Sequence, residues 1–152
     1  LNPKEYSTTG NQEIDGVLNY MLQKANKTLN QVDVQINIPE DLYFNNFNIC
    51  VILGNLVDNA VREASKSKEK LLTIKMQIKQ EVLLIFIENS YSGKILEKRN
   101  GLQTTQPELA IHGIGLENVK KVVIANGGEI KIDYTSNRFC VQVLLYMSRI
   151  KN

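Results

Sequence analysis

The chain has 152 residues, a size that fits one domain with a single core and leaves little room for two. With 43% hydrophobic and 22% charged residues, its composition is that of a folded globular protein and excludes wholesale disorder. A formal net charge of +2 is too balanced for an ordinary basic nucleic-acid-binding protein, so we expect no nucleic-acid partner. No apolar run approaches the roughly 20 residues that cross a bilayer. The chain has one histidine and two distant cysteines, which excludes a structural zinc site.

The first half of the chain predicts a helix, a strand and a second helix. Apolar residues at helical spacing predict an amphipathic helix over 11–27, with Asn11 among the capping groups before it. Strict alternation of apolar and polar residues predicts a strand over 32–38 with one face in the core. Pro39 ends that strand. A second apolar stripe predicts a helix over 47–64.

The second half predicts two pairs of strands around a long loop and a short helix. These elements are strands over 71–79 and 82–87, a loop over 89–112, a helix over 116–125, and strands over 129–134 and 139–146. The run 82–87 is apolar without alternation, which indicates a central strand covered on both faces. A loop as long as 89–112 is typical of a functional lid or of disorder. Because the strands outnumber the helices and come in adjacent pairs, we expect an α+β fold. It would be a two-layer α/β sandwich, with a mixed sheet of about five strands and three helices on one face.

We expect residues 1–10 to form an extended lead-in from a dimerisation region outside this chain, and residues 11–152 to form a single domain.

Three polar residues form a stripe on the second predicted helix. Asn55 and Asn59 are four residues apart, and Arg62 follows one turn later on the same face. Asparagine is a mediocre helix former, so two of them inside one helix indicate a role beyond helix formation. Amide oxygens could ligate a hard cation such as magnesium, with Arg62 near phosphate. The alternative is a solvated face on an ordinary helix.

Two further segments carry polar or flexible residues where elements begin or end. The segment 112–116, His-Gly-Ile-Gly-Leu, follows the long loop and opens a helix, so its backbone could approach a phosphate closely. Its alternative is a flexible helix entry that binds no ligand. Asn89 follows the most apolar strand and has an amide that suits the edge of a purine. Its alternative is an Asx-type turn leaving the strand.

The order of these segments resembles the ATP-binding fold of the GHKL superfamily, also called the Bergerat fold. The segment NLVDNAVREA looks like its N box, and HGIGLENVKKVV looks like its second glycine box. The segments TGNQEIDGVLNYML, ENSYSG and HGIGLENV together are most similar to the Agr-type quorum-sensing histidine kinases. The resemblance covers nearly the whole chain and implies ATP and Mg²⁺ as cofactors.

The resemblance implies a role for each matching residue. Asn59 corresponds to the magnesium-binding asparagine, Arg62 to a basic position near the phosphates, and Asn89 to the residue that accepts from the adenine amino group. Asn55 stands where hydrolytic members have a glutamate that activates water; an amide cannot act as a general base, so we expect a poor ATPase. The remaining ATP-binding residues that the resemblance implies are Gly93, Thr104, Thr105, His112, Gly113, Gly115 and Leu116.

The resemblance implies the ATP-binding catalytic domain of a two-component sensor histidine kinase that acts in peptide quorum sensing. The γ-phosphoryl group of ATP would pass to a histidine in a separate dimerisation domain, which forms a homodimer in the full-length protein, and then to a response regulator. The domain would be the cytoplasmic part of a membrane-anchored receptor kinase, attached to the membrane only through its N-terminal region. Tyr91 replaces the middle glycine of the first glycine box. That departure leaves open a degenerate module that dimerises or signals without ATP turnover. A GHKL ATPase or an anti-sigma-type serine kinase is a further alternative, and Asn55 argues against the ATPase.

Overall fold

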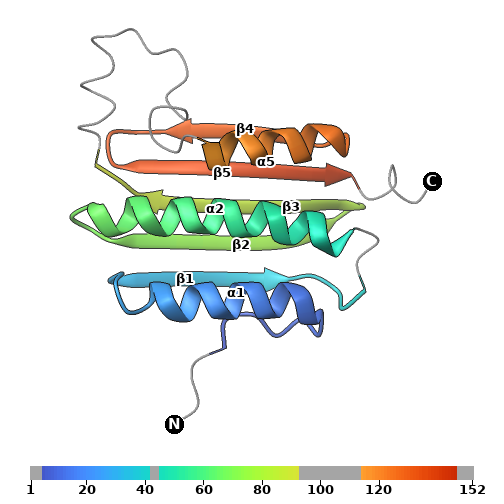
Figure 1. Ribbon diagram of the computed structural model, residues 1–152, viewed down its shortest axis with the longest axis horizontal. Helices are drawn as coiled ribbons and strands as arrows, with labels where there is room; N and C mark the ends of the chain where they lie inside the picture. The colour runs from blue at the N-terminus through green and yellow to red at the C-terminus, as the bar shows by residue number, and fades with distance from the viewer. Residues whose placement is uncertain (1–4, 42–44, 93–113, 147–152) are drawn as a thin grey trace, which may run out of the picture.

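The computed structural model describes residues 5–41, 45–92 and 114–146, with the side chain of Ile114 excepted. In these ranges, three helices lie on one side of a five-stranded sheet, as Figure 1 shows. The elements in chain order are α1 (Gln12–Ala25), β1 (Gln31–Asn37), α2 (Asn46–Lys66), β2 (Leu71–Lys79), β3 (Val82–Ser90), α5 (Ile114–Ala125), β4 (Glu129–Tyr134) and β5 (Arg138–Tyr146). The predicted α+β sandwich is confirmed. None of the described helices is both long enough and apolar enough to span a membrane.

The strand order of the sheet is β1-β2-β3-β5-β4. β1 runs parallel to β2, so α2 serves as the crossover between them, and every other pair is antiparallel. β3 is therefore the central strand. Its register places Asn89 between Leu72 of β2 and Phe139 of β5.

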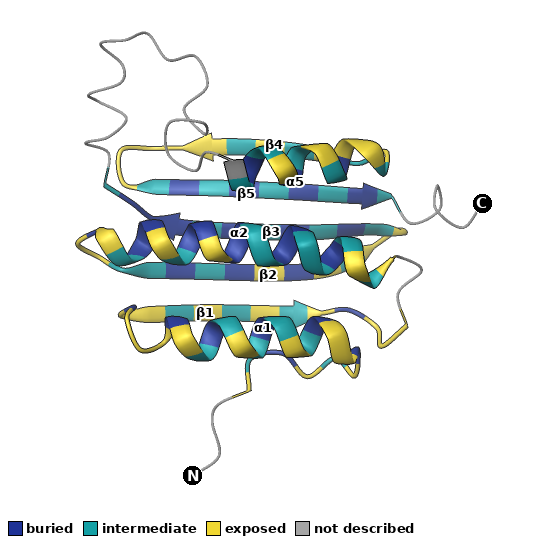
Figure 2. Ribbon diagram, in the orientation of Figure 1, coloured by how far each residue is buried: buried dark blue, intermediate teal, exposed yellow. Residues whose placement is uncertain are grey.

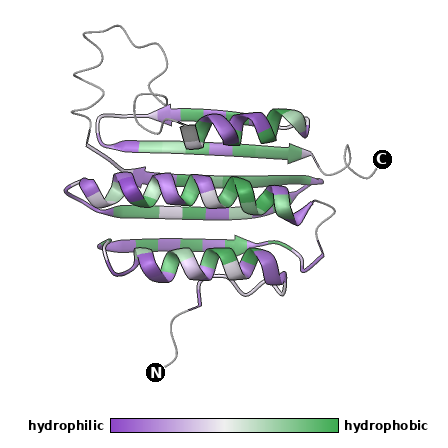
Figure 3. Ribbon diagram, in the orientation of Figure 1, coloured by the Kyte–Doolittle hydropathy of each residue, from purple (hydrophilic) through white to green (hydrophobic). Residues whose placement is uncertain are grey.

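The core lies between the helices and the facing side of the sheet. Figure 2 shows buried stripes along the helices and alternating burial along the central strands, and Figure 3 shows hydrophobic stripes along the helices but a nearly continuous hydrophobic run along β3. The fully buried side chains with the largest volumes include Ile14, Leu18, Leu22, Ile49, Ile52, Leu53, Leu72, Ile74, Met76, Leu83, Ile85 and Phe139. They come from both layers, so one continuous core joins the helices to the sheet.

Two expectations about β3 are wrong. The strand predicted over 82–87 continues to Ser90, and its side chains alternate in burial instead of being buried on both faces. In the described ranges the helices cover only one face of the sheet. On the other face, Leu84 and Phe86 are half-buried among cross-strand neighbours, and the Nζ of Lys75 lies 5.6 Å from the centre of the Phe86 ring. Apolar side chains on an uncovered sheet face thus hide the alternation in the sequence.

Local capping accounts for the helix boundaries. The side chain of Asn11 accepts a hydrogen bond from the N–H of Ile14 at the start of α1. Asn45 caps α2 in the same way, and its side chain accepts from the N–H groups of Phe47 and Asn48. α5 is followed by Gly127 with a φ of 71°, a left-handed conformation that favours glycine and ends the helix.

The segment just before α1 is bonded to that helix through Asp15. Oδ1 of Asp15 accepts from the hydroxyl groups of Ser7 (2.6 Å) and Thr9 (2.8 Å) and from the N–H of Thr9 (3.1 Å). Oδ2 accepts from the N–H of Gly10 at 3.0 Å. Partial burial opposes ionisation of Asp15, but these hydrogen bonds outweigh it and lower the pKa of the carboxyl. The segment before α1 therefore has a defined position on the domain.

Candidate functional site

The described candidate residues come from α2 and from two elements that pack against it, β3 and α5. In Figure 1 β3 and α2 both end toward the left, and α5 begins at its own left end. Asn55, Asn59 and Arg62 come from α2, Asn89 from β3, and Gly115 and Leu116 from α5. Gly93, Thr104, Thr105, His112 and Gly113 lie outside the described residues.

Asn59 is buried, with 4% of its surface exposed, although it lies in the middle of a helix. Its Oδ1 accepts a hydrogen bond from the guanidinium group of Arg62, one turn later. Its Nδ2 is buried and has no hydrogen-bond partner among the described residues. The alternative of a solvated face is therefore wrong for Asn59, because α5 packs over this part of α2. A buried amide donor without a partner is costly, and it marks a position where a ligand can supply one.

Gly115 makes this packing possible. A Cβ atom at Gly115 would lie 2.9 Å from Nδ2 and 3.2 Å from Oδ1 of Asn59, so the Asn59 amide would have to shift to make room for it. Glycine therefore allows the first turn of α5 to lie directly against the Asn59 amide. The next residue, Leu116, is 1% exposed and anchors that turn in the core. The structure therefore joins the two sequence segments that resemble the N box and the second glycine box.

Arg62 and Asn55 make their contacts along α2 itself. Arg62 forms an ion pair of 3.3 Å with Asp58 in addition to its bond with Asn59, and about half of its side chain is exposed. The Nδ2 of Asn55 donates to the carbonyl of Val51, 2.9 Å away. The amide of Asn55 is thus held along its own helix.

Asn89 is 2% exposed and faces the helix layer together with the buried Ile85 and Ile87 of the same strand. Its Nδ2 donates to the carbonyl of Ser90 at 2.9 Å. The strand continues past Asn89, so the alternative of an Asx-type turn at this position is wrong. Asn89 therefore places an amide beneath the helices, at the C-terminal end of the central strand.

A pair of serines that the sequence analysis did not single out joins α2 to the end of β3. The Oγ atoms of Ser67 and Ser90 lie 2.7 Å apart, and both residues are buried. Ser67 also donates to the carbonyl of Ala64, and Ser90 accepts from the N–H of Leu71 at 2.8 Å. Ser67 ends α2, and a small polar residue after a predicted helix was the one signal available in the sequence.

Tyr91 is a core residue in the position where the first glycine box has its middle glycine. It is 3% exposed, and its ring meets Phe139 edge-on at a centroid distance of 5.9 Å. Its hydroxyl donates to the carbonyl of Thr135, and its N–H donates to the carbonyl of Asn137 at 3.2 Å. Burial raises the pKa of Tyr91. These contacts fix the chain at the end of β3 to the turn between β4 and β5.

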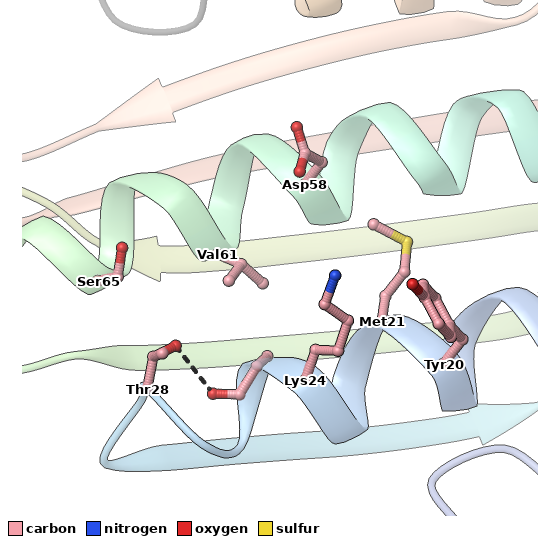
Figure 4. A pocket seen from close by; sticks show the side chains of 8 residues that line it. Tyr20, Met21, Lys24, Thr28, Asp58, Val61 and Ser65 are labelled. Carbon is pink, nitrogen blue, oxygen red and sulfur yellow. Dashed lines mark hydrogen bonds between the residues drawn. The ribbon is translucent and has the colours of Figure 1, made fainter.

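A separate groove of about 430 Å³ lies between α1 and α2 (Figure 4). Lys24 and Met21 enter it from α1, and Val61 and Ser65 enter it from α2. Asp58, the ion-pair partner of Arg62, also lines this groove. The ion pair between Asp58 and Arg62 thus connects this groove to the buried amide of Asn59, to which Arg62 also donates.

The residues around Asn59 fit phosphate directly, and they fit magnesium only through Oδ1 of Asn59, which accepts from Arg62 in this structure. In the described ranges, no group of three or more His, Cys, Asp or Glu side chains could hold a metal ion, so an all-protein cage is absent there. Magnesium in nucleotide sites takes few protein oxygens and completes its shell with phosphate and water. The Asn59 amide has an unpartnered Nδ2, and α5 begins beside it with a helix N-terminus that favours anions. Among the described residues, Asn59 and Arg62 are the side chains that could hold such a group.

Comparisons with known proteins agree with the fold described above. No curated protein sequence matches the chain. Among solved structures, histidine kinase AdeS of Acinetobacter baumannii has a TM-score of 0.65 at 20% identity, over 89% of this chain and 63% of its own. The histidine kinase domain of a blue-light-activated kinase from Erythrobacter litoralis has a TM-score of 0.65 at 13% identity, over 98% of this chain and 65% of its own. The catalytic domain of histidine kinase ThkA has a TM-score of 0.63 at 18% identity, over 93% of this chain and 96% of its own.

This chain therefore spans less than two thirds of the first two structures and nearly all of the third. At such identities the likeness establishes the fold, which is that of histidine kinase catalytic domains. The family model described as the GHKL domain matches residues 44–146, more than half of the chain. The chain therefore belongs to the GHKL domain family.

Proposed function

We propose that this chain is the ATP-binding catalytic domain of a sensor histidine kinase. The observation that carries the proposal is the buried Asn59 amide, whose Nδ2 has no partner among the described residues and which lies against Gly115. A structural asparagine in a core would be fully hydrogen bonded, whereas this one has a free donor beside the N-terminus of α5. The fold shared with histidine kinase catalytic domains supports the same conclusion.

Each described residue has a distinct role in this proposal. Asn59 offers Oδ1 to the magnesium ion that accompanies ATP, and Arg62 binds phosphate with its planar guanidinium. Asn89 accepts from the adenine amino group at the end of β3. Magnesium supplies charge neutralisation for the phosphates when it is bound. The domain contributes mainly position and electrostatics to phosphoryl transfer, and Asn55 supplies no general base.

The acceptor in this proposal is a histidine on a separate dimerisation domain, from which a response regulator takes the phosphoryl group. The membrane-anchored, cytoplasmic setting and the peptide quorum-sensing role belong to the same proposal. They are supported by the similarity of TGNQEIDGVLNYML, ENSYSG and HGIGLENV to the Agr-type kinases. Labelling the longer protein with γ-labelled ATP tests the transfer, because a phosphohistidine is stable in base and labile in acid.

A second candidate, a module that signals without nucleotide, is favoured by one observation. Tyr91 fills the glycine-box position with a buried ring, which removes conformational freedom from the backbone there. The two candidates differ in whether the chain binds ATP.

A thermal-shift titration with ATP, with and without magnesium, separates them. ATP at about 100 times its Kd adds about 2.7 kcal/mol to the free energy of unfolding. For a chain of this size, the melting temperature then rises by roughly 5–10 °C. Asn59→Ala should abolish the magnesium-dependent part of the rise.

Asn48→Ala is the matched control, because Asn48 lies on the same face of α2 about 16 Å earlier. It should leave the ATP-induced rise unchanged. No rise at millimolar ATP would favour the module without nucleotide, and an equal loss in both variants would contradict the role of Asn59.

A further inference from the structure

Arg62 lies between two acceptors on its own helix. It pairs with Oδ2 of Asp58 at 3.3 Å and donates to Oδ1 of Asn59. Asp58 is largely exposed, whereas Asn59 is 4% exposed. The guanidinium therefore bridges the surface of α2 and the buried amide of the proposed site.

This bridge conflicts with magnesium binding. The oxygen that Arg62 occupies is the one that Asn59 would offer to the metal, and two cations on one amide oxygen repel each other strongly away from bulk water. The conflict is removed if Arg62 leaves Asn59 and binds the phosphates, which the planar guanidinium matches well. Arg62 must then also break its ion pair with Asp58.

We infer that Asp58 holds Arg62 in a resting position on Asn59 and thereby lowers the affinity of the site for nucleotide. The inference rests on the proposed function and adds to it a residue that restrains the site. Asp58 competes with phosphate for the guanidinium of Arg62, because the same Nη atom that bonds Asn59 also pairs with Asp58. Asp58 lines the groove between α1 and α2, outside the buried site (Figure 4).

A double-mutant cycle on nucleotide affinity tests this inference. The four proteins are the unmodified chain, Asp58→Asn, Arg62→Met and the double variant, each titrated calorimetrically with ATP and magnesium. Asp58→Asn should tighten ATP binding about two-fold, the effect of releasing an exposed ion pair between residues i and i+4. Arg62→Met should weaken binding about ten-fold through the lost phosphate contact. In the Arg62→Met background, the gain from Asp58→Asn should disappear.

Glu117→Gln controls for the general effect of removing a negative charge. Glu117 lies in the first turn of α5 and pairs with Lys120 at 4.0 Å. The effect of Glu117→Gln on ATP affinity should be the same whether residue 62 is arginine or methionine. An Asp58→Asn gain that persists in the Arg62→Met background overturns the inference, as does the absence of any gain.

The resting contact is tested without nucleotide by the NMR signal of the Asn59 side-chain amide. Arg62→Met and Asp58→Asn should both shift this signal, and Glu117→Gln should not. An unshifted signal in Arg62→Met overturns the resting position. If the chain binds no ATP, both the proposed function and the restraint of Arg62 by Asp58 are contradicted. If the chain binds ATP and Asp58→Asn has the same effect with arginine or methionine at position 62, only the restraint is contradicted.

Discussion

Two polar clusters in this molecule differ in how completely their groups are hydrogen bonded. On α1, Oδ1 of Asn19 accepts from the N–H groups of Tyr6 (2.6 Å) and Ser7 (2.9 Å), and Nδ2 donates to the carbonyl of Ser7 at 2.8 Å. On α2, Asn59 has one bond to Oδ1, from Arg62, and its buried Nδ2 has no partner in the described part of the chain. The two asparagines are chemically identical and lie on neighbouring helices.

The two asparagines therefore differ in what they contribute: Asn19 stabilises the fold, whereas Asn59 has a group available to a ligand. A fully bonded amide such as Asn19 stabilises the fold, because each bond replaces one that water would make. A buried donor without a partner destabilises the fold by roughly 1–3 kcal/mol. Asn59 is thus in a position that costs stability, which is expected where a side chain serves a ligand. The comparison predicts that the same substitution destabilises the fold far more at Asn19 than at Asn59.

Replacing each asparagine by alanine should give the largest contrast. Asn19→Ala removes three hydrogen bonds and should lower the free energy of unfolding by about 2–3 kcal/mol. Asn59→Ala removes one hydrogen bond, from the half-exposed Arg62, together with a donor that has no partner among the described residues, so it should lower the free energy of unfolding by no more than about 1 kcal/mol. Urea unfolding measures both changes.

ATP-induced stabilisation should show the opposite ranking: Asn19→Ala should keep it, and Asn59→Ala should lose it. Equal loss of stability in the two variants would show that Asn59 is structural and would remove the distinction between the clusters.

Gly115→Ala tests whether the close packing on Asn59 is what maintains its position. The new methyl group would overlap the amide, so we expect a loss of about 1–2 kcal/mol in unfolding free energy and at least a ten-fold loss of ATP affinity. Gly54→Ala on α2 is the control, because a Cβ atom there has nothing within 4 Å. It should raise the unfolding free energy by about 0.5–1 kcal/mol and leave ATP affinity unchanged. Unchanged ATP affinity in Gly115→Ala would mean that Asn59 can shift without consequence.

Periodicity predicted most of the fold, since it reports which side chains face the core. The strands 71–79 and 129–134 have the predicted boundaries, and the other predicted helices and strands differ from the structure by one to three residues at their ends. The prediction failed at the end of β3, where Asn89 and Ser90 are polar yet remain in the strand. Their polar groups are bonded locally or to Ser67, contacts that a pattern of apolar residues does not report.

The sequence predicted the segments that form the candidate site, but it did not predict how these segments lie against one another. Asn59 and Gly115 are far apart in the sequence, and their contact arises from the packing of α5 on α2. The stripe Asn55–Asn59–Arg62 placed three polar residues on one helix face, but the structure buries Asn59 and bonds Asn55 to its own helix. Burial of one polar residue among several depends on the neighbouring element, so periodicity within one helix cannot reveal it.

The smallest expected effect concerns Asp15, which completes the bonded cluster on α1. Because the pKa of Asp15 is lowered in the folded chain, its carboxylate stabilises the fold above the unfolded pKa of about 4 and loses this contribution as the pH falls through the folded pKa. Asp15→Asn should therefore lower the unfolding free energy at pH 7 by about 1 kcal/mol, since an amide keeps one acceptor oxygen and cannot accept both the bonds from Ser7 and Thr9 on Oδ1 and the bond from Gly10 on Oδ2. The difference from the unmodified chain should shrink below about pH 4, measured by urea unfolding over a pH series. ATP-induced stabilisation at pH 7 should be the same in both proteins, because this cluster holds the segment before α1 and contributes nothing to the Asn59 site. A difference that stays constant from pH 7 to pH 3 would show that the hydrogen bonds do not depend on the charge of Asp15.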